Sequence, residues 1–164
     1  MSSRTTRLVA AAVALVAVVV VVALVATRDD DGGSPATTAE VQQAVVTARN
    51  RADFSFERIT KSQDVDDFLD RMNEASGNIG DAASELDELN APDPYAEEVD
   101  NLVVALDQLS VDLSATAADL ERPELLGDLV TGARGINFDS WDEANRALAA
   151  LIGLGIEVDL LQRY

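Results

Sequence analysis

The chain has 164 residues and a formal net charge of −18. It contains neither cysteine nor histidine, which excludes disulfides, thiolate and imidazole metal sites, haem attachment, cysteine nucleophiles and the Ser-His-Asp triad. Because so acidic a surface repels nucleic acid and anionic lipid headgroups, we expect no nucleic-acid partner.

The N-terminal region holds an uninterrupted apolar run, Leu8–Ala26, with nine Val and three Leu. A helix rises about 1.5 Å per residue, so this run is long enough to cross the apolar core of a bilayer, about 30 Å thick, once. Arg4 and Arg7 precede the run, whereas Arg28 alone follows it closely, and this bias favours a cytoplasmic N-terminus. We therefore predict a protein of the cell membrane, with a cytoplasmic segment 1–7, a single transmembrane helix 8–28 in contact with the lipid bilayer, and an extracytoplasmic remainder.

A cleaved signal peptide is the alternative interpretation of this run. The apolar region of a signal peptide is usually about 7–15 residues long, and its cleavage site needs small residues at positions −3 and −1. Ala23 and Ala26 fit position −1, but Val21 and Leu24 stand at the matching −3 positions. An uncleaved anchor is the prediction, and a secreted helical protein is the alternative.

Residues 29–36 (DDDGGSPA) form an acidic linker rich in Gly. Beyond Arg28 the chain carries nine basic against thirty acidic residues, a net charge of −21. We interpret this charge as a solvated surface, with attraction for a basic partner or for cations as the alternative. Residues 37–164 are enough for one hydrophobic core.

Thr37-x-x-Glu40 has the pattern of a capping box and precedes apolar residues spaced three and four apart, which predicts a helix over 38–60. Ser62 is expected to cap a second helix that extends to about Asn90. Gly77 and Gly80 lie within that helix and indicate either a kink or the close approach of another helix.

Ala91-Pro92-Asp93-Pro94 predicts a tight connection, with Asp93 as the N-cap of a third helix and Pro94 at its first position. The stripe that begins at Val99 extends this helix to about Glu121. A short loop between two long helices of similar length implies an antiparallel hairpin.

Pro123 opens a shorter predicted helix that ends at Gly132 to Gly135. Ser140-x-x-Glu143 is a second capping-box pattern and predicts a last helix that ends at Gly153 or Gly155. The expected buried face of that helix comprises Trp141, Ala144, Leu148, Leu151 and Ile152. In the tail, the alternating residues Ile156, Val158 and Leu160 are expected to pack on the bundle.

Carboxylates are the only abundant reactive groups, and they match no known catalytic or metal-binding pattern. The segment that begins with Asp64, Asp66 and Asp67 lacks the Gly and the Glu that a calcium loop needs at its sixth and twelfth positions. We therefore interpret these residues as acids at the N-terminus of a helix. Lys61-Ser62 does not have the Ser-x-x-Lys spacing. We predict no enzyme, and no catalytic, cofactor-binding or metal-binding residue.

Aromatic residues are few: Trp141, Phe54, Phe56, Phe68 and Phe138 are the candidates for a small-ligand pocket or for plain core. Helical spacing favours core. Phe54 is the exception, because it lies off the main apolar stripe beside Phe56, and we expect it to be exposed for partner binding.

The apolar run, the acidic linker and the segments LNAPDPYAEEVDNLVVALDQL and WDEANRALAALIGLGIEV resemble uncharacterised actinobacterial membrane-anchored or secreted helical proteins over residues 83–158. The resemblance implies long amphipathic helices joined by a loop that contains Pro. It carries no assigned activity and no functional residue.

The expected fold is all-α: a single transmembrane helix followed by an extracytoplasmic four-helix-type bundle with short extra helical pieces. The expected function is that of a non-catalytic interaction or structural module with a protein or cell-envelope partner. The alternative is a ligand-binding or sensor domain with a pocket near Gly77, Gly80 and Trp141.

Overall fold

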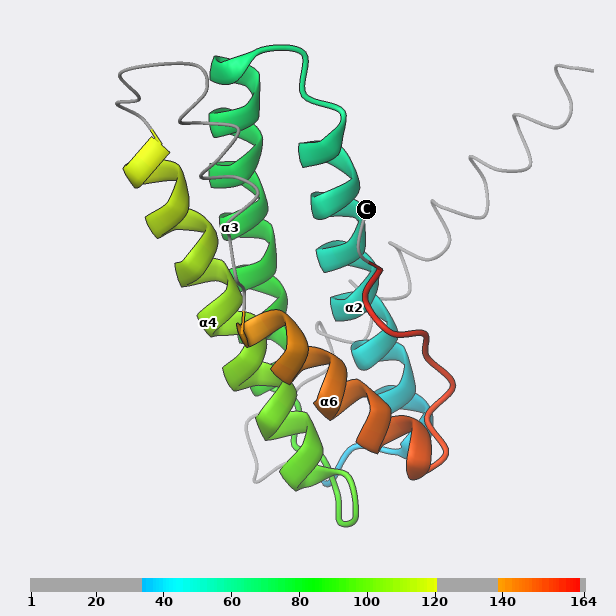
Figure 1. Ribbon diagram of the computed structural model, residues 1–164. Coiled ribbons are helices and arrows are strands. Elements are labelled where there is room, and N and C mark those ends of the chain that lie inside the picture. The colour runs from blue at the N-terminus through cyan, green and yellow to red at the C-terminus, as the bar shows by residue number, and fades with distance from the viewer. Residues whose placement is uncertain (1–33, 121–138, 163–164) are drawn as a thin grey trace, which may run out of the picture. The chain divides into compact units, whose positions relative to one another are not determined.

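The computed structural model describes residues 34–120 and 139–162, and their regular structure is entirely helical. Four helices follow one another in the sequence (Figure 1). They are α2 (Thr38–Thr60), α3 (Val65–Asp87), α4 (Ala96–Leu120) and α6 (Asp139–Gly153). The expectation of an all-α fold is therefore confirmed for these residues.

The predicted membrane span 8–28, most of the linker 29–36 and the short helix expected after Pro123 lie outside the described residues. None of the helices in the described ranges combines the length and the low polarity that crossing a bilayer requires. The described helices all belong to one compact unit, Pro35–Tyr164.

The start of α2 follows the sequence pattern closely. The Glu40 N–H donates to the Thr37 hydroxyl, and the Glu40 carboxylate accepts from the Thr37 N–H at 2.7 Å. Both halves of the capping box are therefore present, and they satisfy two backbone donors that the helix cannot pair internally. This part of the prediction is confirmed.

Two other predicted helix starts are wrong. Asp64, not Ser62, caps α3, because its carboxylate accepts the Asp67 N–H at 2.8 Å while the Ser62 hydroxyl donates back to Ile59 in the preceding turn. Likewise α4 begins at Ala96 rather than at Pro94, after a turn in which the Tyr95 N–H donates to the Pro92 carbonyl at 2.8 Å.

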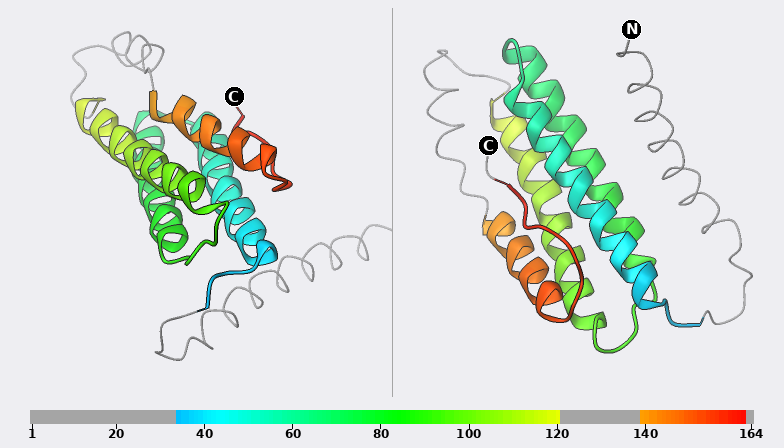
Figure 2. Two further views of the ribbon diagram at one scale, coloured as in Figure 1. Left: turned by 90° about the horizontal axis from the view of Figure 1, so that it is seen from below. Right: turned by 90° about the vertical axis from the view of Figure 1, so that its right-hand side faces the viewer.

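Successive helices are neighbours: α2 packs on α3, α3 on α4, and α4 on α6. Figure 1 shows α2, α3 and α4 running alongside one another in alternating directions, which confirms the predicted antiparallel hairpin of α3 and α4. The shorter α6 is inclined to them, and Figure 2 shows the chain after α6 on the side of α2. That segment is hydrogen-bonded to α2, and Trp141 of α6 also packs directly against Phe56 of α2.

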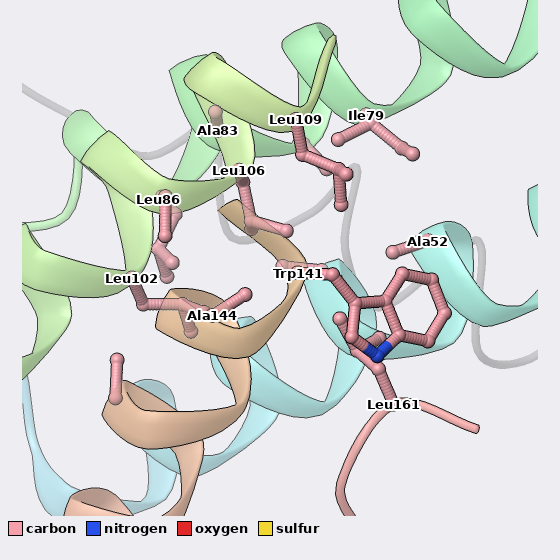
Figure 3. Packing of buried hydrophobic residues seen from close by; sticks show 14 of the residues in the cluster. Ala52, Ile79, Ala83, Leu86, Leu102, Leu106, Leu109, Trp141, Ala144 and Leu161 are labelled. Carbon is pink, nitrogen blue, oxygen red and sulfur yellow. The ribbon is translucent and has the colours of Figure 1, made fainter. Parts of the chain in front are cut away.

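One apolar cluster fills the space between the four helices, and Figure 3 shows part of it. The predicted stripes supply most of its members, because residues three and four apart lie on one helical face. The most completely buried large side chains are Met72, Ile79, Leu86, Leu102, Leu106, Leu109, Leu113, Leu148, Leu151, Ile156, Val41 and Val45.

Gly80 marks a close approach of α3 to α4. A Cβ added there would lie 3.1 Å from the Ser110 Oγ, whereas a Cβ added at Gly77 would meet nothing within 4 Å. Ser76 and Ser110 exchange hydrogen bonds across the same contact, each hydroxyl donating to the other's carbonyl at 2.9 and 2.8 Å. The predicted close approach is therefore confirmed at Gly80 and not at Gly77.

The C-terminal part departs from the prediction in three places. Ser140 lies inside α6, where it is buried and donates to Asp112 of α4 at 2.5 Å, so it does not cap the helix. Ile152 is exposed although it was expected in the core. In the tail, Leu161 is buried and Leu160 is exposed, the reverse of simple alternation.

Candidate functional site: an open hollow beside Phe54

Among the candidate aromatic residues, Phe56, Phe68 and Trp141 lie in or against the core, whereas Phe54 is exposed. Phe56 and Trp141 meet edge to face with their ring centroids 4.4 Å apart, a favourable packing geometry. Phe54 is 59% exposed. The structure thus assigns Phe56 and Trp141 to the core and confirms that Phe54 is exposed, while Phe138 lies outside the described residues.

An open hollow of about 480 Å³ lies beside Phe54, between α2 and α3. Its lining comes from both helices and is mainly polar: Arg51, Phe54, Ser55 and Arg58 from α2, and Glu74, Asn78, Asp81 and Glu85 from α3. The α2 members share a face because they are spaced three and four residues apart. We call these eight residues the Phe54 hollow.

Two ion pairs join the helices across the hollow. Arg51 Nη1 contacts Glu85 Oε1 at 2.7 Å, and Arg58 contacts Glu74. The Arg58 guanidinium also lies 6.0 Å from the centre of the Phe54 ring, at the limit of a cation–π contact. All four charged side chains are more than a third exposed, so these pairs add little stability and mainly fix the side chains that form the rim.

Ser55 lies in the lining of the hollow and is only 3% exposed. Its Oγ has no hydrogen-bond partner within the described part of the chain. A buried hydroxyl without a partner carries a desolvation cost. Ser55 is therefore a buried lining residue whose hydroxyl makes no hydrogen bond within the described residues.

The hollow is lined by charged and polar groups beside one exposed aromatic ring. Its groups are guanidinium, carboxylate, amide and hydroxyl, and its carboxylates are exposed or held by arginine. Among residues 34–120 and 139–162, no group of three or more acidic side chains is placed to hold a metal ion.

The acids at the start of α3 serve the helix itself. The Gln63 N–H donates to the Asp67 carboxylate at 2.9 Å, and Arg71 donates to it at 2.7 Å. These hydrogen bonds hold the pKa of Asp67 below its ordinary value, and the bond from the Gln63 N–H has the largest effect. Asp64 caps the helix, and Asp66 and Asp67 lie in its first turn. The prediction that these residues are helix N-terminal acids is therefore confirmed.

The structure does not bring Gly77, Gly80 and Trp141 into one pocket. Gly80 faces Ser110 of α4, Gly77 faces open space, and Trp141 packs against Phe56 of α2. The Phe54 hollow is instead lined by residues of α2 and α3 that include none of these three.

The sequence reading found Phe54 but missed its charged neighbours. Arg51 and Arg58 lie three residues before Phe54 and four after it, a signal for one shared helical face that is visible in the sequence. Their partners on α3 carry no such signal, because the register between two helices follows from core packing.

Comparisons with protein-family models, with curated proteins and with solved structures found no match to this chain.

Proposed function

We propose that the chain is a single-pass membrane protein whose helical unit acts outside the cytoplasmic membrane as a non-catalytic interaction module. The apolar run 8–26, with Arg4 and Arg7 before it, supports the anchor and its orientation. The net charge of −21 beyond Arg28 supports a well-solvated unit on the outer side.

The observation that carries the interaction role is the exposed ring of Phe54 above a hollow whose rim is set by two ion pairs. An aromatic ring that is 59% exposed contributes a large apolar area when a partner covers it, and aromatic and arginine residues are the residue types enriched at binding hot spots. The partner would place an apolar group on Phe54 and polar groups beside the two ion pairs.

Photocrosslinking tests the docking role. A benzophenone amino acid at position 54 is expected to give a discrete adduct in the native cell. The matched control is the same substitution at Val104, which is 67% exposed on α4. An adduct at position 54 that is absent at position 104 supports the proposal, whereas identical adducts at both positions, or none at position 54, contradict it.

Protease digestion tests the orientation. Protease added to intact cells stripped of their wall should digest the helical unit, which the full chain reports through a C-terminal tag. Protection of the tag until the cells are lysed would show that the unit lies on the cytoplasmic side.

A ligand-binding or sensor role is the second candidate, and the unpartnered hydroxyl of Ser55 favours it. A small molecule that pairs with this hydroxyl would raise the unfolding temperature of the full chain in a panel of metabolites and cations, and the Ser55→Ala variant would lose that rise. If no compound stabilises the protein, this second role fails.

A further inference from the structure

The segment that follows α6 is held by amide side chains. Gln42 of α2 donates to the Glu157 carbonyl at 2.6 Å and accepts the Glu157 N–H at 2.9 Å. Asn145 of α6 makes the equivalent pair at Leu161, accepting its N–H at 2.7 Å and donating to its carbonyl at 3.5 Å. Two helices thus bind the same backbone groups that a neighbouring strand would bind.

A nearly buried ion pair on α2 adds two more contacts of the same kind. Arg49 donates to the Leu160 carbonyl at 2.8 Å, and Asp53 accepts the Gln162 N–H at 3.0 Å. The Arg49 and Asp53 side chains lie 3.5 Å apart and are only 10% and 13% exposed. All six hydrogen bonds end on backbone atoms of the segment, so they are independent of its side chains.

Two side chains of the segment are fully buried anchors, and Val158 between them is partly buried against the core. Ile156 is 1% exposed and Leu161 is 5% exposed, whereas Leu160 beside it is 44% exposed. Gly155, with φ +96°, directly precedes the first anchor and turns the chain back after α6. Backbone hydrogen bonds combined with a few apolar anchors are the general means by which proteins recognise peptides.

The segment leaves two buried donors beneath it unsatisfied. Arg49 Nε and Trp141 Nε1 have no hydrogen-bond partner anywhere in residues 34–120 and 139–162. Trp141 is 5% exposed, and Figure 3 shows its indole nitrogen directed toward Leu161. Because a buried donor without a partner is costly, a segment that brought an acceptor to this place would fit better than the chain's own.

We propose that the groove between α2 and α6 is a peptide-binding site that residues 156–162 occupy in cis. Its ligand is a non-helical peptide of a partner protein, with apolar side chains at the positions of Ile156 and Leu161 and a side-chain oxygen that reaches Arg49 or Trp141. The inference rests on the proposed role as an interaction module, but it uses a different face from the Phe54 hollow.

A labelled peptide tests the groove on the full chain, purified in a mild detergent. The probe is fluorescein-GIEVDLLQ, the sequence of residues 155–162. Leu161→Ser weakens the tail without altering the groove, and Leu160→Ser is its matched control, because Leu160 is exposed. We expect Leu161→Ser to bind the probe at least tenfold more tightly than wild type or Leu160→Ser, and Asn145→Ala added to Leu161→Ser to weaken binding again.

Equal binding by the two serine variants, or binding of a control peptide GSEVDLSQ as tight as that of the probe, would overturn the proposal. Dimers of wild type that form through the tail would assign the groove to a second copy of this chain and would overturn it too. A failed photocrosslink at position 54 leaves these outcomes unaffected, so the two proposals fail separately.

Hydrogen exchange on the wild-type chain keeps the proposal testable if Leu161→Ser does not fold. The N–H groups of Glu157, Leu161 and Gln162 are bonded to side chains of the groove. We expect them to exchange at least 100-fold faster than the buried N–H groups of α4, through opening of the tail alone. Exchange of both sets at one common rate would show that the tail cannot leave the groove, and would contradict the proposal.

Discussion

Replacing Gly77 or Gly80 by Ala tests the contact between α3 and α4 with a built-in control. Both residues lie inside α3, where Ala is favoured over Gly by about 1 kcal/mol. A Cβ at Gly77 meets nothing within 4 Å. We therefore expect Gly77→Ala to raise the free energy of unfolding by about 1 kcal/mol, and the unfolding temperature by about 4 °C.

Gly80→Ala should have the opposite sign. Its Cβ would lie 3.1 Å from the Ser110 Oγ, which cannot retreat freely because it donates to the Ser76 carbonyl at 2.8 Å. Overpacking of this kind costs about 1–3 kcal/mol. With a cost of about 2 kcal/mol against a gain of about 1 kcal/mol from helix propensity, Gly80→Ala is expected to be about 1 kcal/mol less stable than wild type.

Urea unfolding of the full chain measures both variants, because Trp141 is its single tryptophan and lies in the core. In a Ser110→Ala background the obstacle is gone, and Gly80→Ala should then stabilise by about 1 kcal/mol. If Gly80→Ala proves as stable as Gly77→Ala in the wild-type background, the close approach of α4 at Gly80 is refuted.

Three further predictions concern the helix ends and the core. Asp67→Asn should lower the urea midpoint at about pH 7 but not at about pH 2. The pKa of Asp67 is lowered in the folded protein, so its contribution to stability is complete above the ordinary pKa of Asp and is lost as the pH falls through the folded pKa. Asp66→Asn is the control, because Asp66 makes neither hydrogen bond and should change the midpoint less, and equal effects of Asp67→Asn at both pH values would contradict the prediction. Thr37→Ala should cost about 1 kcal/mol of unfolding free energy through loss of the capping box, and no change in the thermal midpoint would argue against the cap. Leu106→Ala should lower the free energy of unfolding by about 2–5 kcal/mol, whereas Val104→Ala, on the exposed side of the same helix, should change it by no more than about 0.5 kcal/mol. If chemical denaturation finds similar losses for the two variants, the assignment of the buried and exposed faces is wrong.

The helices could be predicted from the sequence because apolar residues spaced three and four apart form the buried face of each helix. The stripe from Val99 to Leu120 predicted α4, whose start lies two residues later than the predicted Pro94. Helix starts were harder, since Ser62 and Asp64 are both good caps and only the local turn decides between them. The tail was harder still: the bonds from Gln42 and Asn145 to its backbone fix which Leu enters the core, and alternation alone does not.

The candidate site was predictable in part. Phe54 stood out because it lies off the apolar stripe, and the structure places it on the surface. The ion pairs beside it join residues 34 and 16 positions apart, so they depend on how α2 and α3 align. The same holds for Gln42, whose partner lies 115 positions away. No local pattern contains that information.

Cysteine labelling with a membrane-impermeant maleimide tests the central claim most directly, because the chain has no native cysteine. The variants are Asp81→Cys, an exposed position in the lining of the Phe54 hollow, and Val104→Cys, an exposed position on α4. In intact cells stripped of their wall, we predict rapid labelling at position 104 and protection at position 81, with both positions labelled in the purified protein. Labelling of neither position until lysis would contradict the extracytoplasmic location, and equal labelling of both in cells would contradict a partner on Phe54.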